Sequence, residues 1–341
     1  MNTLSNISEL RIGLSGLIRA SAIIVLSGLL VSCAFGDEDA VQSLFGDSEE
    51  PLFVAVGTMS GNYALYGSPV GSVWSGNLLP GAGGGTLYSA VYGKDMLIAV
   101  GTSPDYFFSL DGLLWIRAST GPAVTIYSAV AGMGRFVAVG DESGTAVIYS
   151  SEDGFIWARN LLAAYSESLR GVAYGNDLFA AVGTGSLIVA SRDGAIWSLN
   201  VGTPVGAGVN LNDVAYGNGM FVAVGDNGSA TVSRDGIVWS RAFFIGMAGG
   251  NLSGIVYGSG KFVAVGTGGT GAAIYISRDG LAWSANVYRG SAAGFQDVTF
   301  SHGAFVAVGN GGQVVYSLDG LQWQTNSLPG SPDLYGITCR P

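Results

Sequence analysis

Apolar residues recur along this chain in short runs separated by glycine-rich turns. One run, F-V-A-V-G or a close variant, begins at residues 53, 97, 136, 179, 221, 262 and 305. A second pattern, L-x-x-V-x-Y-G, precedes it, as in Leu211–Gly217. No stretch beyond the N-terminus repeats apolar residues at helical spacing, so both patterns predict β-strands.

A third pattern, S-x-D-G-x-x-W, follows each F-V-A-V-G run. It contains every tryptophan of the chain, namely Trp74, Trp115, Trp157, Trp197, Trp239, Trp283 and Trp323. Its aspartates are Asp111, Asp153, Asp193, Asp235, Asp279 and Asp319, whereas the first copy, Ser68–Trp74, has lost the aspartate. The tryptophans are 40 to 44 residues apart, which matches the length of a four-stranded propeller blade.

Each repeat therefore predicts four strands, named A to D here. Strand A is the L-x-x-V-x-Y run, strand B is F-V-A-V-G, strand C ends at the serine of the third pattern, and strand D carries the tryptophan. Gly217-Asn218-Gly219 supplies positive-φ residues for a tight A–B hairpin. The serine and glycine of the third pattern fit a type I turn between strands C and D.

The two ends of the repeat region predict how the ring closes. The first strand B, at Phe53, has no strand A before it, while a lone strand A, Leu334–Cys339, follows the last complete unit. Pairing this strand into the first blade removes the exposed sheet edges. We therefore expect an all-β, seven-bladed β-propeller of four-stranded antiparallel blades, closed by the C-terminal strand.

The third pattern resembles the Asp-box, or BNR, repeat of sialidase-like propellers. The whole unit is similar to bacterial repeat proteins that read Y-G-N-G-x-F-V-A-V-G and then S-x-D-G-x-x-W. The resemblance covers residues 51–341 and implies a structural role for the box, in C–D turns on the face away from any catalytic pocket. It implies no activity, and the box here has one residue fewer between Asp and Trp than the usual sialidase box.

The N-terminus has the pattern of a targeting segment. Arg11 and Arg19 precede a twelve-residue apolar run that is too short to span a bilayer. The sequence Leu30-Val31-Ser32-Cys33 resembles a bacterial lipobox, which implies removal of residues 1–32 and a lipid on Cys33. An ordinary signal peptide with an incidental cysteine and an uncleaved anchor are the alternatives.

Residues 33–50 are rich in acids and predict a solvated tether between the lipid and the propeller of residues 51–341. Ala34 resembles the residue that follows the cysteine in lipoproteins sorted to an outer membrane. The resemblance thus implies a membrane partner reached through the lipid, and a place in the cell envelope at the outer membrane.

Charge excludes one class of partner. The chain carries a net charge of −10 and only two lysines, whereas nucleic-acid binding needs clustered Lys and Arg. We therefore expect no nucleic-acid partner.

Candidate catalytic groups are sparse. The propeller contains three Glu, at 142, 152 and 167, and one histidine, His302, in an A–B turn. Arg192, Arg234 and Arg278 lie at equivalent box positions of successive blades and cannot converge on one ligand. Glycosidases and metal sites need converging partners, so we predict no catalytic residue, metal site or cofactor.

The D–A connections vary more than the strands that they join, and loops on a rigid scaffold often carry recognition. Candidate binding residues in these connections are Phe243, Phe244, Met247, Tyr165, Tyr288 and Arg289. The alternative is that these apolar residues extend strand D or pack between blades. The sequence favours a non-catalytic recognition or scaffold lipoprotein that binds protein, or glycan, through this loop face. A sialidase-like hydrolase or lyase and a structural subunit of an outer-membrane assembly are the alternatives.

Overall fold

The computed structural model describes residues 21–26, 29–34, 52–79, 84–102, 105–119, 124–162, 166–199, 208–244, 250–268, 271–286, 288 and 293–340. The chain divides into two compact units, Met1–Glu49 and Glu50–Pro341. In the first unit, β1 (Ser21–Leu26) pairs antiparallel with β2 (Leu29–Ala34). Most of the predicted tether lies outside the described residues. No described helix is long and apolar enough to cross a membrane.

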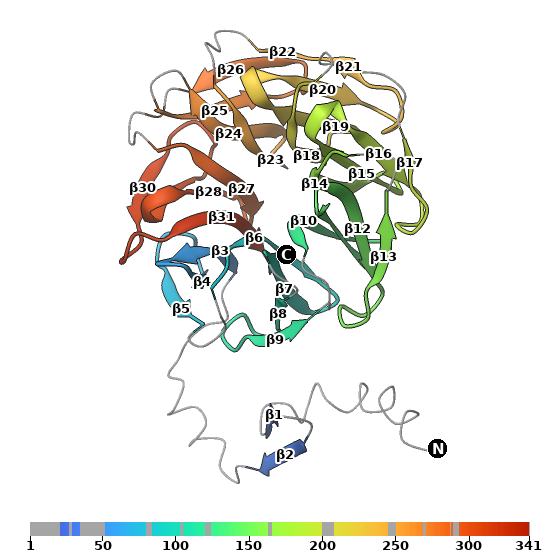
Figure 1. The fold of residues 1–341 in the computed structure, drawn as a ribbon. Helices are drawn as coiled ribbons and strands as arrows, with labels where there is room; N and C mark the ends of the chain where they lie inside the picture. Colours follow the sequence, from blue (N-terminus) through green and yellow to red (C-terminus); the bar gives the residue numbers. More distant parts are fainter. Residues whose placement is uncertain are drawn as a thin grey trace. The chain divides into compact units, whose positions relative to one another are not determined.

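The second unit is a ring of seven blades, each built on four antiparallel strands (Figure 1). Six blades have these strands in chain order from the centre outward, and the first has the C-terminal strand at its centre. This confirms the predicted propeller. The inner strands (A) are β31 (Asp333–Cys339), β6 (Leu87–Gly93), β10 (Thr125–Gly132), β14 (Leu169–Gly175), β18 (Leu211–Gly217), β23 (Leu252–Gly258) and β27 (Phe295–Ser301). The second strands (B) are β3 (Phe53–Met59), β7 (Met96–Gly101), β11 (Arg135–Glu142), β15 (Leu178–Gly183), β19 (Met220–Gly225), β24 (Lys261–Gly268) and β28 (Ala304–Gly309).

The outermost strand of each blade is the shortest. The third strands (C) are β4 (Asn62–Ser68), β8 (Asp105–Ser109), β12 (Thr145–Ser151), β16 (Ile188–Ser191), β20 (Ala230–Ser233), β25 (Gly271–Ser277) and β29 (Gln313–Ser317). The outer strands (D) are β5 (Ser75–Leu78), β9 (Ile116–Ser119), β13 (Ala158–Leu161), β17 (Ser198–Leu199), β21 (Ser240–Arg241), β26 (Ala282–Asn286) and β30 (Gln324–Ser327). A two-residue strand, β22 (Phe243–Phe244), adds to β26 in parallel.

The tryptophan is not part of strand D in most blades, contrary to the sequence prediction. It precedes the outer strand in six blades and lies within it only at Trp283 in β26. In these six blades the tryptophan belongs to the C–D turn, where its indole N–H donates to the box glycine carbonyl, as Trp197 does to Gly194 at 3.3 Å.

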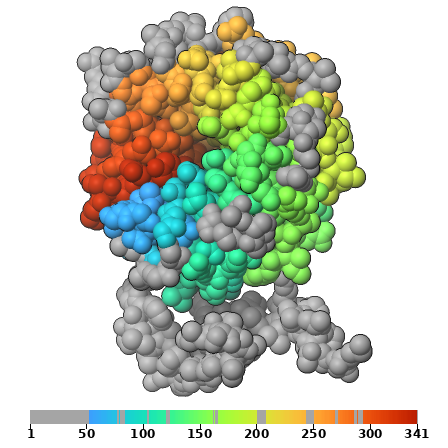
Figure 2. Space-filling model, in the orientation of Figure 1, coloured from blue at the N-terminus to red at the C-terminus, as the bar shows by residue number. Residues whose placement is uncertain are grey.

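The ring closes as the sequence predicted. Strand β31 pairs antiparallel with β3, with Phe53 opposite Cys339. The N–H of Arg340 also donates to the Leu52 carbonyl at 2.8 Å. Figure 2 shows the N-terminal part of the ring, in blue, beside its C-terminal part, in red. The C-terminal strand therefore joins the two ends of the repeat region.

The core consists of separate apolar clusters between neighbouring blades. In β19, Phe221 and Ala223 pack in the cluster shared with the fourth blade, while Val222 and Val224 pack in the cluster shared with the sixth. Side chains of a strand alternate between its two faces, so both faces of F-V-A-V-G are buried. This explains why the motif is continuously apolar.

The turns divide the propeller into two faces. One carries the A–B hairpins and the box turns, as the hydrogen bond from Asn218 Nδ2 to the Arg278 carbonyl shows, and is called the box face. Asn218 and Gly219 have φ of 49° and 74°, which confirms the predicted left-handed hairpin. The other carries the B–C and D–A connections and is called the loop face. Its short turns include η2 (Thr184–Ser186), η3 (Asp226–Gly228) and η4 (Asn310–Gly312).

Candidate functional site: a depression at the centre of the ring

A depression of about 380 Å³ lies where the inner strands meet the loop face. It is lined mainly by second- and third-position residues of the L-x-x-V pattern. The lining residues are Tyr88, Ser89, Tyr127, Ser128, Arg170, Asn212, Asp213, Asp226, Asn251, Ser253, Gln296, Asp297 and Tyr335. Pockets of this size suit small ligands or a few residues of a larger one.

A β-bulge near the start of each inner strand creates this lining. In β18, Leu211 pairs with Gly225 and Asp213 with Val224, so Asn212 is the extra residue. The same register shift skips Tyr88, Tyr127, Arg170, Ser253, Gln296 and Tyr335 in the other inner strands. A bulge turns its side chain away from the regular alternation of the sheet. All seven second-position residues are therefore bulge residues at the centre of the ring.

The last glycine of F-V-A-V-G makes room for each bulge. A Cβ on Gly225 would lie 2.0 Å from the Asn210 carbonyl oxygen, and one on Gly101 would lie 1.9 Å from that of Thr86. Both contacts are to backbone, which cannot move aside without disturbing the ladder. This glycine is therefore a sequence signal for the bulge opposite it.

Three consecutive blades give the depression an aromatic wall. The ring centroid of Tyr88 lies 5.3 Å from that of Tyr127 and 5.4 Å from that of Tyr335. All three side chains are half-buried. Burial raises the pKa of Tyr127 and of Tyr335, so both phenols stay neutral at physiological pH. Tyr127 and Tyr335 therefore present uncharged rings at this wall.

The opposite wall is polar. The guanidinium of Arg170 lies 5.9 Å from the centre of the Tyr127 ring and donates to Asn212 Oδ1 at 3.4 Å. Asn212 Nδ2 donates to Asp226 Oδ1 and to the Leu252 carbonyl, each at 2.9 Å. These bonds fix Asn212 between the fifth and sixth blades.

Third-position side chains form the floor and join neighbouring blades. The hydroxyl oxygen of Ser89 accepts the N–H of Ala129 at 3.2 Å, and Asp213 Oδ2 accepts the N–H of Ile255 at 2.8 Å. Asp297 Oδ2 accepts the N–H of Ile337, in the closing strand, at 2.9 Å. The floor therefore contributes hydrogen bonds between blades as well as lining the depression.

Asp213 and Asp297 are separated by one blade that carries a glycine at the same position. A Cβ on Gly254 would lie 2.8 Å from the Asp297 Cα, so a larger residue would not fit. Each carboxylate also accepts the N–H of the next residue in its own strand, at 2.8 Å for Asp213 and 2.7 Å for Asp297. The glycine thus allows the inner strands to approach closely around the two carboxyls.

The two carboxyls titrate unusually. Burial raises the pKa of Asp297 to about 7. Burial, together with the charge of Asp297, raises the pKa of Asp213 well above its ordinary value. Backbone N–H donors act in the opposite direction, but removal from water has the larger effect. The pair therefore holds at least part of a proton near neutral pH.

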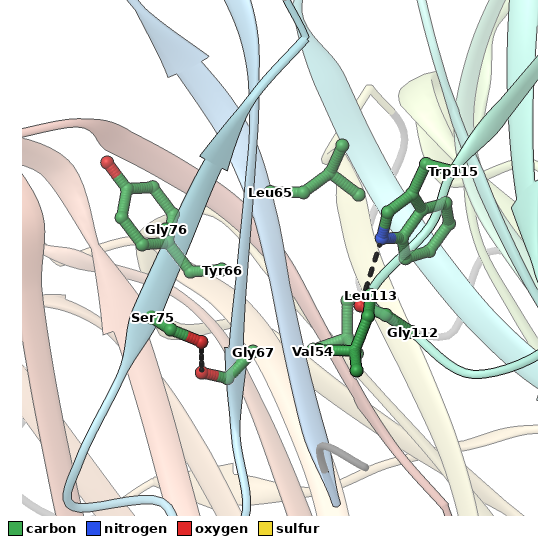
Figure 3. A pocket seen from close by; sticks show the side chains of 9 residues that line it. All are labelled: Val54, Leu65, Tyr66, Gly67, Ser75, Gly76, Gly112, Leu113 and Trp115. Carbon is green, nitrogen blue, oxygen red and sulfur yellow. Dashed lines mark hydrogen bonds between the residues drawn. The ribbon is translucent and has the colours of Figure 1, made fainter. Parts of the chain in front are cut away.

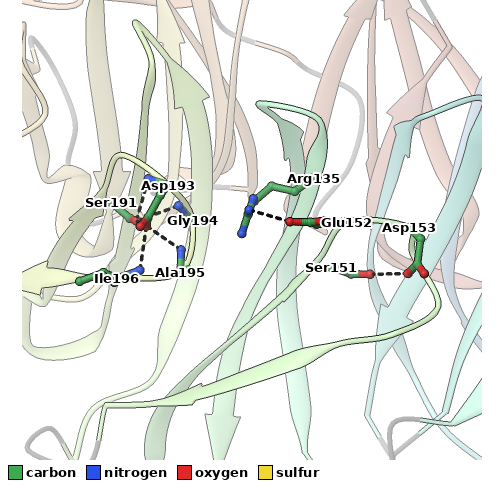
Figure 4. A network of polar contacts seen from close by, with 9 residues as sticks. All are labelled: Arg135, Ser151, Glu152, Asp153, Ser191, Asp193, Gly194, Ala195 and Ile196. Carbon is green, nitrogen blue, oxygen red and sulfur yellow. Dashed lines mark hydrogen bonds and ion pairs between the residues drawn. The ribbon is translucent and has the colours of Figure 1, made fainter.

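The box turns lie on the box face, away from the depression, and six of them share one arrangement. In the fourth blade, Asp193 Oδ1 accepts the N–H groups of Ala195 and Ile196 at 2.9 and 2.8 Å and the hydroxyl of Ser191 at 3.0 Å (Figure 4). These backbone donors hold the pKa of Asp193 below its usual value. The two N–H groups and the Ser191 hydroxyl all belong to the same turn as Asp193.

Charged residues near the boxes pair along the rim rather than converge. Arg135, which opens β11, bonds Glu152 in the box of its own blade at 3.2 Å and lies near the next box, at Asp193 (Figure 4). Arg192, Arg234 and Arg278 are exposed in successive box turns. His302 is an exposed hairpin residue with φ of 47°, and its Nδ1 lies 2.8 Å from the Ser301 hydroxyl.

A second, smaller cavity of about 180 Å³ lies between the first and second blades (Figure 3). Gly67 and Gly76 line it together with the ring of Trp115. In the next joint, Phe108 takes the place of Gly67 and packs edge-on against Phe155 at 5.0 Å. The cavity therefore lies where Gly67 and Leu113 occupy the positions of Phe108 and Phe155.

The D–A residues chosen from the sequence lie elsewhere than the lining of the depression. Tyr288 is half-buried, its ring 5.2 Å from that of Phe295 and its hydroxyl 2.7 Å from Thr325 Oγ1. The backbone of Phe243 and Phe244 forms β22 beside β26. Tyr165, Met247 and Arg289 lie outside the described residues. Recognition through this set stays a prediction.

Sequence reasoning missed the residues that line the depression. Three of the seven second-position residues are tyrosines in consecutive blades, and this clustering is visible in the sequence. The bulge glycine opposite them was the second signal. Neither was used, because the L-x-x-V pattern was interpreted as an ordinary strand.

No protein-family profile and no curated protein matches this chain. Solved structures do match it. A structure described as YCF48 bound to D1 peptide is 17% identical with a TM-score of 0.56, covering 71% of this chain and 82% of that one. A catalytically inactive virginiamycin B lyase from Staphylococcus aureus with quinupristin is 11% identical with a TM-score of 0.63, covering 71% and 84%.

The WD40 propeller domain of Doa1 is a further similar structure, 15% identical with a TM-score of 0.52, covering 77% of this chain and 90% of that one. One of these proteins is described as an enzyme, and the other two are not. At such identities the likeness shows the propeller fold alone.

Proposed function

We propose that this chain is a non-catalytic recognition module that binds a partner at the central depression of its loop face. The observation that carries the proposal is the ring of seven bulges, which places seven side chains of five kinds around one cavity. The scaffold repeats, yet these positions do not. Varied side chains on a repeated, rigid frame are what selective binding requires.

The carboxyls of the depression support binding over hydrolysis. A glycosidase needs one free acid and a second carboxylate or tyrosine beside the substrate. A carboxyl with a pKa of about 7, as at Asp297, is the observation that favours an enzyme. Both oxygens of Asp297 and of Asp213 accept backbone N–H groups, however, so both carboxyls already serve the joints between blades.

A protein segment is the partner that we propose, with a glycan as the alternative. The side chain of Gln296 carries donors and an acceptor, which suits the backbone of a peptide, and the tyrosines offer apolar area for its side chains. One similar propeller is described as bound to a peptide, which adds support.

Anchoring through a lipid on Cys33 remains part of the proposal, with the propeller held in the cell envelope at the outer membrane. The lipobox resemblance of Leu30–Cys33 supports it. Replacing Cys33 with Ser is expected to release the protein from the membrane fraction. Unchanged retention, with no acyl mass on the N-terminal peptide, would contradict the anchor but leave the binding proposal intact.

Two variants test where recognition occurs. Tyr88→Ser with Tyr335→Ser removes the centre of the aromatic wall, while Phe243, Phe244 and Met247 changed together to Ser remove the loop candidates. Crosslinking in the native envelope, followed by affinity purification, gives the partners of each. We expect the tyrosine pair to lose a partner that the folded wild type captures.

The outcomes separate the two sites. Loss in the tyrosine pair alone places recognition in the depression, and loss in both variants extends it across the loop face. Loss in the loop variant alone would overturn the central site and support the original D–A candidates. If both folded variants keep every partner, the binding proposal for this face fails.

A further inference from the structure

We infer that the central depression receives a primary ammonium group, carried on an aliphatic chain, between the aromatic wall and the two aspartates of the floor. The inference rests on the proposed function and specifies its chemistry. A lysine side chain of a partner and a free alkylamine share this chemistry, and the experiment below distinguishes them.

The aromatic wall of the depression can attract a cation. The face of a tyrosine ring attracts a cation within about 6 Å of its centre. The chain itself shows this at Tyr127, where the guanidinium of Arg170 lies 5.9 Å from the ring centroid. Tyr88 and Tyr335 continue the same wall, and both line the cavity half-buried. A second cation therefore has aromatic surface beside the first.

The lining of the depression has more acidic than basic residues. Among the described lining residues, Asp213, Asp226 and Asp297 are acids and Arg170 is the one base. Asp226 is held by the amides of Asn210 and Asn212, at 2.9 Å each, which leaves the floor pair facing the cavity. The whole chain is also acidic, with a net charge of −10. Cationic ligands are thus favoured both at long range and at the floor.

The floor carboxyls have capacity left for such a ligand. Each oxygen of Asp213 and Asp297 accepts one backbone N–H, and a carboxylate oxygen has about two acceptor sites. A primary ammonium has three donors to fill the remaining sites. A quaternary ammonium has none, so it would gain the rings but not the floor.

An organic cation fits better than a metal ion. Among the described residues, no group of three or more His, Cys, Asp or Glu is placed to hold a metal. Hard divalent cations take six or more oxygen ligands, whereas this floor offers two carboxyls beside an aromatic wall. The tyrosine rings can pack against an aliphatic stem, whereas a hydrated metal ion offers them no apolar surface.

Binding is expected to depend on pH. Burial raises the pKa of Asp297 to about 7, and burial with the charge of Asp297 raises that of Asp213. An incoming ammonium stabilises the ionised forms and so releases a proton. The other charged or titratable groups that line the cavity are Arg170, Asp226, Tyr88, Tyr127 and Tyr335. Affinity should therefore increase as pH rises from 6 to 8.

The test is calorimetric titration of the full chain with n-pentylamine, 1-pentanol and choline, and with Nα-acetyl-lysine methylamide. We expect the two primary amines to bind at least tenfold more tightly than the alcohol and more tightly than choline. Equal binding of amine and alcohol, or stronger binding of choline, would overturn the inference. Binding of pentylamine without the lysine derivative would assign the site to free amines.

Variants tie the binding to the depression. Asp297→Asn should weaken pentylamine binding about tenfold and remove much of its pH dependence. Tyr88→Leu, which leaves the floor bonds intact, should weaken it about fivefold. Glu152→Gln, a carboxylate change in the box face, is the matched control and should leave affinity unchanged. If Asp297→Asn does not fold, Tyr88→Leu and the wild-type pH profile decide the inference.

The failures are distinguishable. Partner capture that depends on Tyr88 and Tyr335, without any amine binding, overturns the ammonium inference and leaves the proposed function standing. Amine binding without any partner lost on changing the tyrosines supports the site chemistry and overturns the protein-recognition proposal.

Discussion

The box turns and the inner strands are both repeated seven times, but they behave differently. Six boxes contain the same Ser, Asp, Gly and Trp with the same hydrogen bonds, as at Asp193 and Trp197. The inner strands keep their backbone bulge but carry five kinds of side chain at it, among them Tyr88, Arg170 and Gln296.

The difference follows from where the bonding partners lie. A box aspartate is satisfied within its own turn, so the same residue works in any blade. A floor residue bonds the next blade, as Asp213 bonds Ile255, and its neighbour must leave room, as Gly254 does. Local satisfaction permits repetition, whereas contacts across blades and toward a cavity select different residues at each position.

Deleting residues 334–341 is expected to have the largest effect, because it removes the one inner strand that comes from the far end of the chain. The deletion exposes the inner edge of β3 and removes Ile337, whose N–H donates to Asp297 at 2.9 Å. We expect unfolding or aggregation, measured by circular dichroism and gel filtration.

Arg340→Ala is the control, since it keeps the strand and removes a side chain whose guanidinium lies 5.7 Å from the Tyr92 ring. It should remain folded and monomeric. A deleted chain that melts at the wild-type temperature as a monomer would show that β31 does not stabilise the ring.

The propeller fold could be predicted from the sequence because the repeated residues are those that pack within each blade and its turns. Seven F-V-A-V-G runs are buried on both faces, and seven box tryptophans mark the turns. Closure by Leu334–Cys339 followed from counting strands. The parallel addition of β22 to β26 could not be predicted, because two phenylalanines alone do not determine which strand they meet.

The central site was not predicted because its signal is a register shift. Tyr88 and Asp213 occupy variable positions of L-x-x-V, and regular alternation puts one of them on each face of a sheet. The bulge brings both to the cavity, and only the glycine across from it, such as Gly101 or Gly225, records that in the sequence. Without knowledge of the register shift, variable residues at these positions do not indicate a binding surface.

The pH dependence of stability should separate the floor from the boxes. Folding raises the pKa of Asp297 to about 7, so its contribution is present below the unfolded value of about 3.9 and is lost as pH rises through 7. Folding lowers the pKa of Asp193 through its backbone donors, so its contribution is present above about 3.9 and is lost on acidification. Maximum stability is expected between these limits.

Thermal melting at pH 3, 5.5 and 8.5 measures the loss of stability on acidification and the loss at alkaline pH. We expect the melting temperature at pH 8.5 to lie on the order of 5 °C below that at pH 5.5. Asp297→Asn should reduce this alkaline difference and leave the acid side unchanged. An alkaline difference that is equally large in Asp297→Asn would place its origin outside the floor.

A single box aspartate should contribute less. Asp193→Ala removes the acceptor of the Ala195 and Ile196 N–H groups in an exposed turn. By analogy with the capping of helix N-termini, the expected loss is about 1 kcal/mol of unfolding free energy, which denaturant titration resolves. Arg192→Ala, next to it in the same turn, should change stability by less than about 0.5 kcal/mol. Equal effects would mean that the box carboxylate has no special role.

The smallest expected effect is a gain, and it comes from the one incomplete box. The first blade already has the box backbone without the carboxylate, because Gly71 has φ of 78° and its N–H donates to Ser68 Oγ at 2.7 Å. Trp74 also donates to the Gly71 carbonyl at 2.9 Å. Val70 stands where the other boxes have Asp, and it is 55% exposed.

Val70→Asp should therefore place an acceptor at the Ser72 and Val73 N–H groups and raise the unfolding free energy by about 0.5 kcal/mol. Val70→Asn, a neutral acceptor of the same shape, should give a smaller gain, and Val70→Ala should give none. The gain from Asp should disappear below about pH 3, where the new carboxylate is protonated. A loss of stability in Val70→Asp with no change in Val70→Ala would show that this turn, unlike its six siblings, does not accommodate a charge. The box would then depend on its blade, and the contrast between self-contained turns and context-dependent inner strands would not hold for the first repeat.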